Sequence, residues 1–246
     1  MSIILSMMLM WSGTMRKQLY ICGDSFCGSD PTGSGSWVNL LQKQHADLDI
    51  INLSSPAASN YLIYLQVKQA IESAADYVIY HATSSIRQEF VINTDSTYRD
   101  TVSRYWHMQH SDVKKPMVCV SWPNPQNTAA GLLSDLQTKE LQNFFNKYID
   151  LTSLIEKNYV FIQHSLNLLD RSKVSNWIWS QGGFEHAGFG NVIPWDFDTY
   201  RPRESIVNLW DYYDPKKKKP YYHVDDPEVI ETVCKHYTKM LQLNNV

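Results

Sequence analysis

Two kinds of segment alternate along this chain: short apolar runs and longer stretches in which apolar residues recur at helical spacing. The short runs are typical of buried strands and lie at 18–22, 49–53, 76–81 and 175–180. The helix-like stretches lie at 37–45, 61–74, 138–157, 159–169 and 227–243. One more apolar run, at 116–122, fits either a further strand or part of an insertion. Strands that alternate with helices predict a parallel sheet with helices on both faces.

The pattern predicts one domain. It contains no internal repeat and no linker rich in Gly, Ser or Pro that would separate two domains. We therefore predict a single α/β domain over residues 15–246, with an insertion in its middle around residues 90–150. Residues 1–14 begin with an apolar run that has no positive charge before it and is too short to span a bilayer. We expect these residues to be an N-terminal extension outside the domain.

Composition narrows the class of partner. Hydrophobic residues make up 43% of the 246 positions, enough for a large core, and the formal net charge is −3. This charge gives no basis for a nucleic-acid or membrane partner. The basic run from Lys216 to Lys219 is interpreted as a solvated loop, with a contact for an acidic partner as the alternative. The four cysteines form no CxxC pair, so we expect reduced thiols and a cytoplasmic protein.

Candidate chemistry stands where the first predicted strand ends. Gly23-Asp24-Ser25-Phe26 directly follows the run at 18–22 and precedes a loop rich in Gly and Ser. A turn at this point presents the Ser25 hydroxyl at the carboxyl edge of the sheet, where open α/β proteins bind their ligands. Gly, Asp and Ser are also common in ordinary turns, so the tetrapeptide alone is weak evidence. Its position directly after the first predicted strand is the stronger evidence for a functional site. Serine becomes a good nucleophile only when a base removes its proton.

This motif and three later segments resemble the sequence blocks of the SGNH (GDSL-type) hydrolases. The resemblance covers the chain unevenly from Arg16 onward. It implies a flavodoxin-like three-layer α/β/α sandwich with a central, mostly parallel sheet. The segment 23–26 resembles the first block, which implies that Ser25 is the nucleophile. The backbone N–H of Ser25 and the neighbouring Asp24 would then line the pocket for the oxyanion or substrate.

The second and third blocks of this family supply further oxyanion donors. The segment 52–60 resembles the second block, with Ala58 among the residues that stand where the family has a glycine. The third block of the family ends in an asparagine turn, whereas this chain has His-Ala-Thr-Ser-Ser-Ile-Arg-Gln-Glu at 81–89. The resemblance leaves four candidates for the missing donor or a substrate contact: Asn60, Thr83, Ser84 and Arg87.

The last block of the family is Asp-x-x-His before the final helix, and it corresponds to 220–223. The resemblance implies that His223 is the base, but position 220 is proline, so an orienting acid must come from elsewhere. A serine–histidine dyad without that acid retains activity. His186 is an alternative base or a substrate contact. The candidates for the orienting acid are Asp225 and Asp226, with Asp211, Asp214 and a backbone carbonyl as alternatives.

Together these residues predict a serine hydrolase that cleaves an ester of a small molecule or a glycan, such as an O-acetyl group on a carbohydrate. Trp195 and Trp210 are candidates for stacking on sugar. We expect no metal or organic cofactor, because His107 and His110 lack a carboxylate or cysteine at ligand spacing. The alternative is a non-catalytic binding or structural protein of the same fold. The divergent blocks resemble SGNH-like proteins of tailed phages, which would place the protein in a virion or the host cytoplasm.

Overall fold

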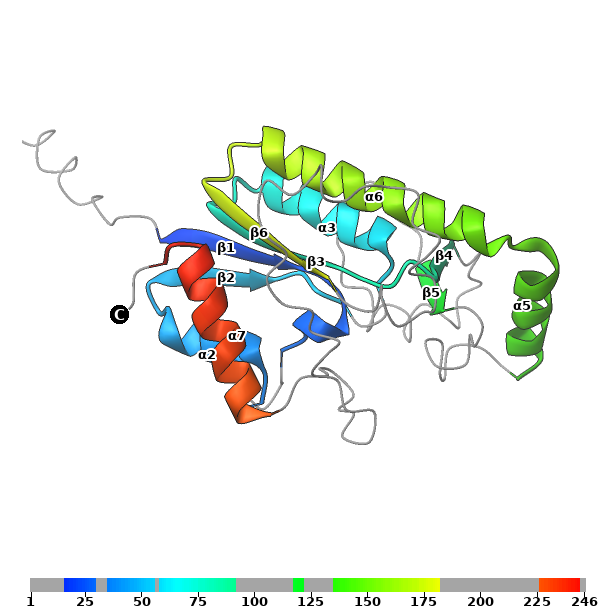
Figure 1. Cartoon of the computed structure of the whole chain (residues 1–246), viewed down its shortest axis with the longest axis horizontal. Helices are drawn as coiled ribbons and strands as arrows, with labels where there is room; N and C mark the ends of the chain where they lie inside the picture. Colours follow the sequence, from blue (N-terminus) through cyan, green and yellow to red (C-terminus); the bar gives the residue numbers. More distant parts are fainter. Residues whose placement is uncertain are drawn as a thin grey trace, which may run out of the picture.

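A four-stranded parallel sheet forms the centre of the fold (Figure 1). The computed structural model describes residues 16–29, 35–55, 58–91, 117–121, 135–181 and 226–243. The strands of the sheet, in the spatial order β2-β1-β3-β6, are β1 (Lys17–Cys22), β2 (Leu48–Asn52), β3 (Tyr77–Ala82) and β6 (Asn176–Gln181). Each strand begins and ends within one residue of the apolar run that predicted it. The order begins as the flavodoxin-like arrangement does, and the predicted α/β fold class is confirmed.

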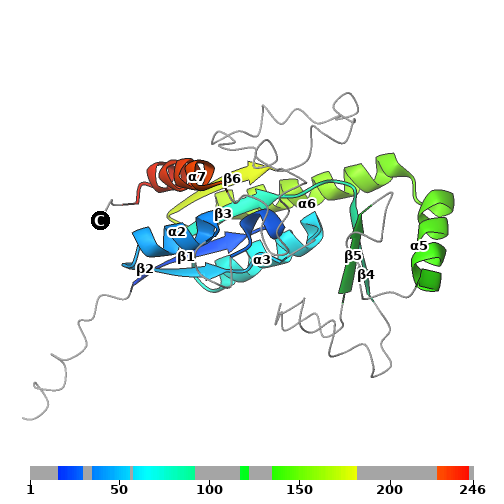
Figure 2. The same cartoon turned by 90° about the horizontal axis from the view of Figure 1, so that it is seen from below.

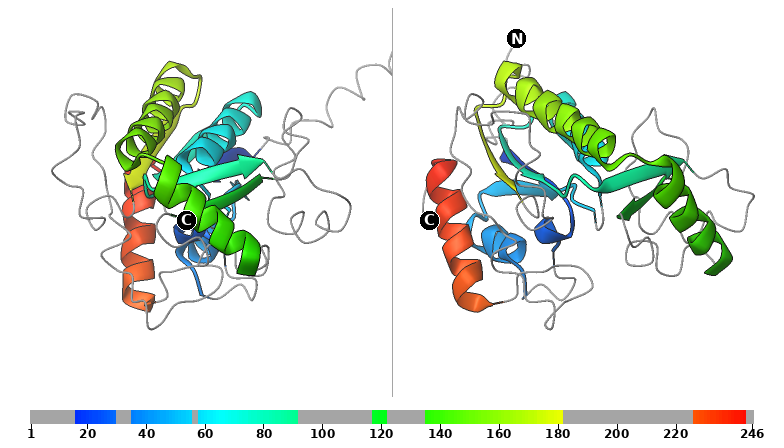
Figure 3. Two further views of the ribbon diagram at one scale, coloured as in Figure 1. Left: turned by 90° about the vertical axis from the view of Figure 1, so that its right-hand side faces the viewer. Right: turned by 45° about the vertical axis from the view of Figure 1, so that its right-hand side comes forward.

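Helices cover both faces of this sheet, which gives three layers (Figures 1 and 3). Helices α2 (Trp37–Gln44) and α7 (Pro227–Met240) pack on one face. Helices α3 (Asn60–Glu72) and α6 (Leu151–Arg171) pack on the other. The predicted helices at 37–45, 61–74 and 227–243 correspond to α2, α3 and α7. The protein is therefore an α/β/α sandwich.

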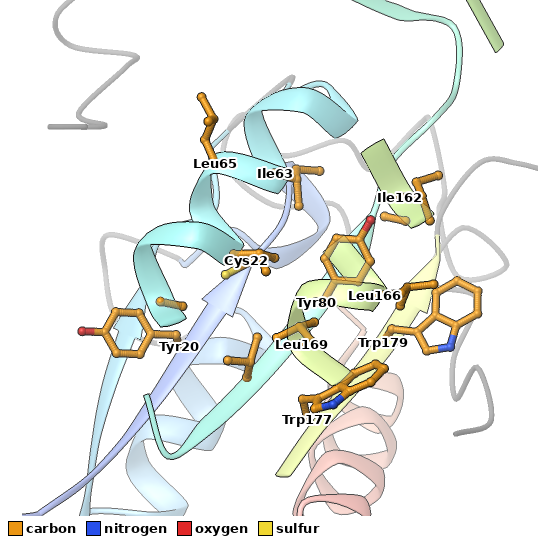
Figure 4. Close-up of a cluster of buried hydrophobic side chains, with 14 of the residues drawn as sticks. Tyr20, Cys22, Ile63, Leu65, Tyr80, Ile162, Leu166, Leu169, Trp177 and Trp179 are labelled. Carbon is orange, nitrogen blue, oxygen red and sulfur yellow. The ribbon is translucent and has the colours of Figure 1, made fainter. Parts of the chain in front are cut away.

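The central strands are buried on both sides, which explains their nearly continuous apolar sequence. Successive side chains of a strand point to opposite faces of the sheet. In β1, Leu19 and Ile21 join the core under α2 and α7, whereas Tyr20 and Cys22 join the core under α3 and α6. Figure 4 shows the second core, which also contains Tyr80 of β3.

A separate two-stranded sheet lies beyond the carboxyl end of β3 (Figure 2). Its strands β4 (Arg87–Val91) and β5 (Met117–Ser121) are antiparallel, and helix α5 (Asp135–Tyr148) lies at the same end of the molecule. The run at 116–122 is thus a strand, as one of its two interpretations had it, but it pairs with β4 and not with the central sheet. Strand β4 was not predicted, because its polar side chains give no strand pattern.

The stretch at 138–157, predicted as one helix, is divided between α5 and α6. Helix α5 ends at Tyr148, and α6 begins at Leu151. Asp150 caps the second helix, since its Oδ2 accepts a hydrogen bond from the backbone N–H of Ser153 at 2.8 Å. A capping aspartate favours a new helix start over continuation. Helix α6 then includes 159–169, as predicted.

Two sequence expectations concern parts of the chain that the structure describes little or not at all. The extension at 1–14 lies outside the described residues, and so does most of the predicted insertion between β4 and α5. Among the helices described, none is long and apolar enough to cross a membrane.

Candidate functional site

The candidate site lies where the strand order reverses. From β1 the chain moves to β2 on one side of the sheet, and the later strands β3 and β6 lie on the other side. Open α/β sheets bind ligands at the carboxyl ends of the strands beside such a switch point. The short 3-10 helix η1 (Ser25–Cys27) follows β1 there, and the segment from Thr83 to Arg87 follows β3. The topology thus brings the first and third predicted blocks to one edge of the sheet.

The turn after β1 is held close to β3 by packing and by a side chain of α3. The backbone N–H of Gly23 donates to Oε1 of Gln66 at 2.6 Å, and Nε2 of Gln66 donates to the Gly23 carbonyl at 3.2 Å. A Cβ on Gly23 would lie 2.7 Å from Sγ of Cys27 and 3.0 Å from Cβ of His81. Glycine is therefore required by the close approach of its neighbours.

Asp24 uses both carboxylate oxygens inside the protein. Its Oδ1 accepts from the backbone N–H of Phe26 at 2.9 Å and lies 3.6 Å from Nε2 of His81. Its Oδ2 accepts from Oγ1 of Thr83 at 2.5 Å and from Nη1 of Arg87 at 2.8 Å. Only 1% of the side chain is exposed. Asp24 therefore links η1, which it caps, to β3 and β4.

The electrostatics of this cluster favour an ionised Asp24 and a neutral His81. Burial opposes ionisation of Asp24 and would raise its pKa. The charge of Arg87 and the nearby His81, together with the hydrogen bonds from Thr83 and Phe26, outweigh burial and hold the pKa below its usual value. Burial lowers the pKa of His81, and the Arg87 charge adds to this against the attraction of Asp24. A neutral imidazole leaves Arg87 as the cation that balances the buried carboxylate.

Arg87 joins three loops at this edge of the sheet. Its Nη1 donates to Oδ2 of Asp24 and also to the carbonyl oxygen of Ala58 at 2.9 Å. The first contact reaches the loop after β1, and the second reaches the loop after β2. Nε of Arg87 is buried without a hydrogen-bond partner, and 12% of the side chain is exposed. The guanidinium group therefore faces mainly into the protein.

A pair of buried amides supports the loop after β3. Oδ1 of Asn60 accepts from the backbone N–H of Thr83 at 2.9 Å. The two hydrogens of the Asn60 amide go to the Thr83 carbonyl and to Oδ1 of Asn158 on α6. The Asn158 amide in turn donates to the carbonyls of Arg87 and Leu154. Both ends of the Thr83–Arg87 segment are thereby fixed, and Asn60 has no amide hydrogen left for an oxyanion in this arrangement.

The other described candidates lie in the same place. Ser25 is buried, with 6% of its surface exposed. The backbone N–H of Ala58 donates to the Ser55 carbonyl at 3.1 Å. Oγ of Ser84 accepts a long contact of 3.5 Å from the backbone N–H of Ile86. The structure therefore brings together seven of the predicted residues: Asp24, Ser25, Ala58, Asn60, Thr83, Ser84 and Arg87.

The predicted base and acids belong to a different part of the chain. Asp226 is exposed and caps α7, where its Oδ1 accepts from the backbone N–H groups of Glu228 at 2.9 Å and Val229 at 3.4 Å. Its role as orienting acid stays a prediction. The other predicted groups of this part of the chain lie outside the described residues: His186, Trp195, Trp210, Asp211, Asp214, His223 and Asp225.

Sequence reasoning missed three buried polar residues of this cluster, and two of them had a recognisable signal. Gln66 and Asn158 are polar residues on the inward face of amphipathic helices, where an unpaired amide would be costly. His81 ends an apolar run and gave no signal of its own. Within the described part of the chain, no group of three or more His, Cys, Asp or Glu side chains is arranged to hold a metal ion.

Comparisons with known proteins leave the family open. No protein-family model matches the chain, and no curated protein matches it. Among solved structures, the chain is similar to a salicylyl-acyltransferase, SsfX3, from a tetracycline biosynthetic pathway. The identity is 11% and the TM-score is 0.36. The matched region covers 94% of this chain and 56% of the acyltransferase, so the chain spans little more than half the length of that protein.

Proposed function

We propose that this protein is a serine-dependent hydrolase that cleaves an acyl ester through Ser25. The observation that carries the proposal is the position of Ser25, in a turn after β1 at the switch point of the sheet. The turn is fixed to the loop after β3 by the buried carboxylate of Asp24. The resemblance of the Gly-Asp-Ser-Phe segment to the first block of SGNH hydrolases supports the same assignment.

The proposed reaction has two steps. Oγ of Ser25 attacks the ester carbonyl carbon while His223 takes the hydroxyl proton, and the resulting tetrahedral oxyanion expels the alcohol, which receives that proton. His223 then takes a proton from water, which attacks the carbonyl carbon of the acyl-enzyme. The bond between that carbon and Oγ of Ser25 breaks, Oγ receives the proton from His223, and the acid is released. Asp225 or Asp226 would orient the imidazole. His186 would contact a substrate such as an O-acetylated carbohydrate.

The oxyanion needs hydrogen-bond donors, and the described contacts narrow the choice among them. Asn60 and Thr83 already donate their side-chain hydrogens within the protein, and so does the backbone N–H of Ala58. We assign the role to the backbone N–H of Ser25, as the resemblance implies, and to the hydroxyl of Ser84. Loss of one such donor typically slows acyl transfer about 100- to 1000-fold.

Labelling with a fluorophosphonate tests the nucleophile directly. We expect the parent protein to become covalently labelled, and Ser25→Ala and His223→Ala to lose the label. Ser165→Ala is the matched control, because Ser165 is a buried serine of α6 whose hydroxyl donates to the Phe161 carbonyl. Labelling that persists in Ser25→Ala would show that another residue is the nucleophile.

A non-catalytic binding or structural protein is the second candidate, and the burial of Ser25 favours it. A side chain that is 6% exposed must become more accessible before it can attack a substrate. If the folded parent takes no label from the fluorophosphonate, the second candidate holds and the hydrolase is rejected.

A further inference from the structure

The carboxylate of Asp24 stands directly beside the proposed nucleophile but is closed off from any substrate. Both of its oxygens accept hydrogen bonds from protein groups, and 1% of the side chain is exposed. Through the bond from the Phe26 N–H, this carboxylate caps the 3-10 turn that begins at Ser25. A shift of Asp24 would therefore shift Ser25.

Arg87 is the only charged group among the described residues that donates a hydrogen bond to this carboxylate. One nitrogen, Nη1, bridges Asp24 and the Ala58 carbonyl, so a single planar group fixes the loops after β1 and β2 relative to β4. The backbone of Arg87 is itself held, because its carbonyl accepts from the Asn158 amide of α6 at 3.1 Å. Arg87 is thus held both at its backbone and at the end of its side chain.

We propose that Arg87 is a positioning residue that acts through Asp24 to hold the Ser25 turn in its reactive orientation, and that it does not contact the substrate. This inference rests on the proposed hydrolase function. It reassigns two residues that the sequence placed in the oxyanion or substrate pocket. The buried Nε of Arg87 and the closed Asp24 carboxylate support this reassignment.

The charges around Asp24 explain why an arginine is needed there. Three titratable groups of the described residues face its carboxylate: Arg87 from β4, His81 from β3 and Cys27 from η1. Burial raises the pKa of the Cys27 thiol, which is therefore neutral, and the lowered pKa of His81 leaves that imidazole neutral as well. Without Arg87 the buried carboxylate would lose the cation that donates a hydrogen bond to it, and its pKa would rise.

A double-mutant cycle separates positioning from substrate contact. The fluorophosphonate labelling of the parent is compared with that of Arg87→Met, Asp24→Asn and the double variant, and the maximal rate and half-saturating concentration are measured separately. We expect Arg87→Met to lower the maximal rate on the order of 100-fold, the loss that a misplacement of about 1 Å can cause. The half-saturating concentration should stay near that of the parent. In the Asp24→Asn background, the same substitution should add little, because the path through Asp24 is already broken.

The pH profile gives a readout that loss of packing alone would not change. In Arg87→Met, labelling should fall further as the pH decreases from neutral, because the uncompensated Asp24 takes up a proton. This dependence should be absent from the double variant. Arg87→Lys keeps the charge and should remove the extra pH dependence. If Arg87→Met does not fold, Arg87→Lys is compared with the parent in its place. Arg16→Met is the matched control, since Arg16 pairs with Asp49 at 3.9 Å on the surface.

The outcomes are distinct. Additive effects of the two substitutions, or a defect confined to the half-saturating concentration, would show that Arg87 contacts the substrate and would overturn the inference while the hydrolase stands. The same holds if Arg87→Lys labels as poorly as Arg87→Met at every pH. A folded parent that takes no label rejects the hydrolase, and the positioning role falls with it.

Discussion

The buried amide pair of Asn60 and Asn158 gives the sharpest stability prediction. Replacing Asn158 by leucine keeps a similar side-chain volume but removes every polar contact. One hydrogen of the Asn60 amide and the carbonyl of Arg87 would lose their partners, at 3.2 Å and 3.1 Å in the parent. Asn60 is fully buried and Asn158 is 2% exposed, so water cannot easily replace the lost bonds.

The magnitude follows from the number of groups left unpaired. A buried polar group without a partner costs about 1–3 kcal/mol, which applies to the Asn60 amide, and the part-buried hydrogen bond to the Arg87 carbonyl adds about 1 kcal/mol. Together these losses should lower the free energy of unfolding by about 2–4 kcal/mol. Urea unfolding followed by circular dichroism measures this change. Because the free energy of unfolding of an ordinary domain is about 5–15 kcal/mol, this loss should lower the urea midpoint strongly.

Asn176→Leu is the matched control for this experiment. Asn176 is part-buried at the start of β6, away from the candidate site, and its amide donates to the Met240 carbonyl at 3.1 Å. The same substitution there should cost about 1 kcal/mol, the net value of an ordinary hydrogen bond. If Asn158→Leu is no less stable than Asn176→Leu, the buried amide pair does not support the loop in the way described.

Three further changes test the site and its supports. Gly23→Ala places a Cβ 2.7 Å from Sγ of Cys27 and should destabilise by about 1–3 kcal/mol in urea unfolding; adding Cys27→Ala should recover part of this loss, and an unchanged midpoint would contradict the contact. Asp24 has a folded pKa below its unfolded value, so its ionisation stabilises the fold above the unfolded pKa of about 3.9, and this contribution is lost as the pH falls through the lower folded value. The stability gap between the parent and Asp24→Asn in thermal unfolding should therefore shrink in acid, whereas a constant gap would argue against the ion pair. Ser59 caps α3 by accepting from the Leu62 N–H, so Ser59→Ala should lower the free energy of unfolding in urea by about 1 kcal/mol; an unchanged midpoint would mean that the cap contributes nothing.

The cluster around Asp24 shows which features of the site can be predicted from local sequence and which cannot. The resemblance at 23–26 and 81–89 selected the residues after β1 and β3, and the strand order then placed both segments at one edge of the sheet. Residues that end neighbouring parallel strands must share an edge of the sheet, which is why this prediction was possible. The partners of each side chain were not predictable. Gln66 and Asn158 come from helices far along the chain, and only packing brings their amides to the loop.

The sequence by itself determined the α/β class and four strands of the central sheet, because a strand buried on both faces must be continuously apolar. It also determined the starts of α2 and α3, to within one residue, through hydrophobic spacing. Only the tertiary structure decided that the run at 116–122 pairs with β4, since strand pairing depends on long-range contacts that local pattern does not encode. It also decided that the carboxylate of Asp24 faces Arg87, because the two residues lie 63 positions apart and meet only when β3 has paired with β1 and the start of β4 lies at the carboxyl ends of these strands.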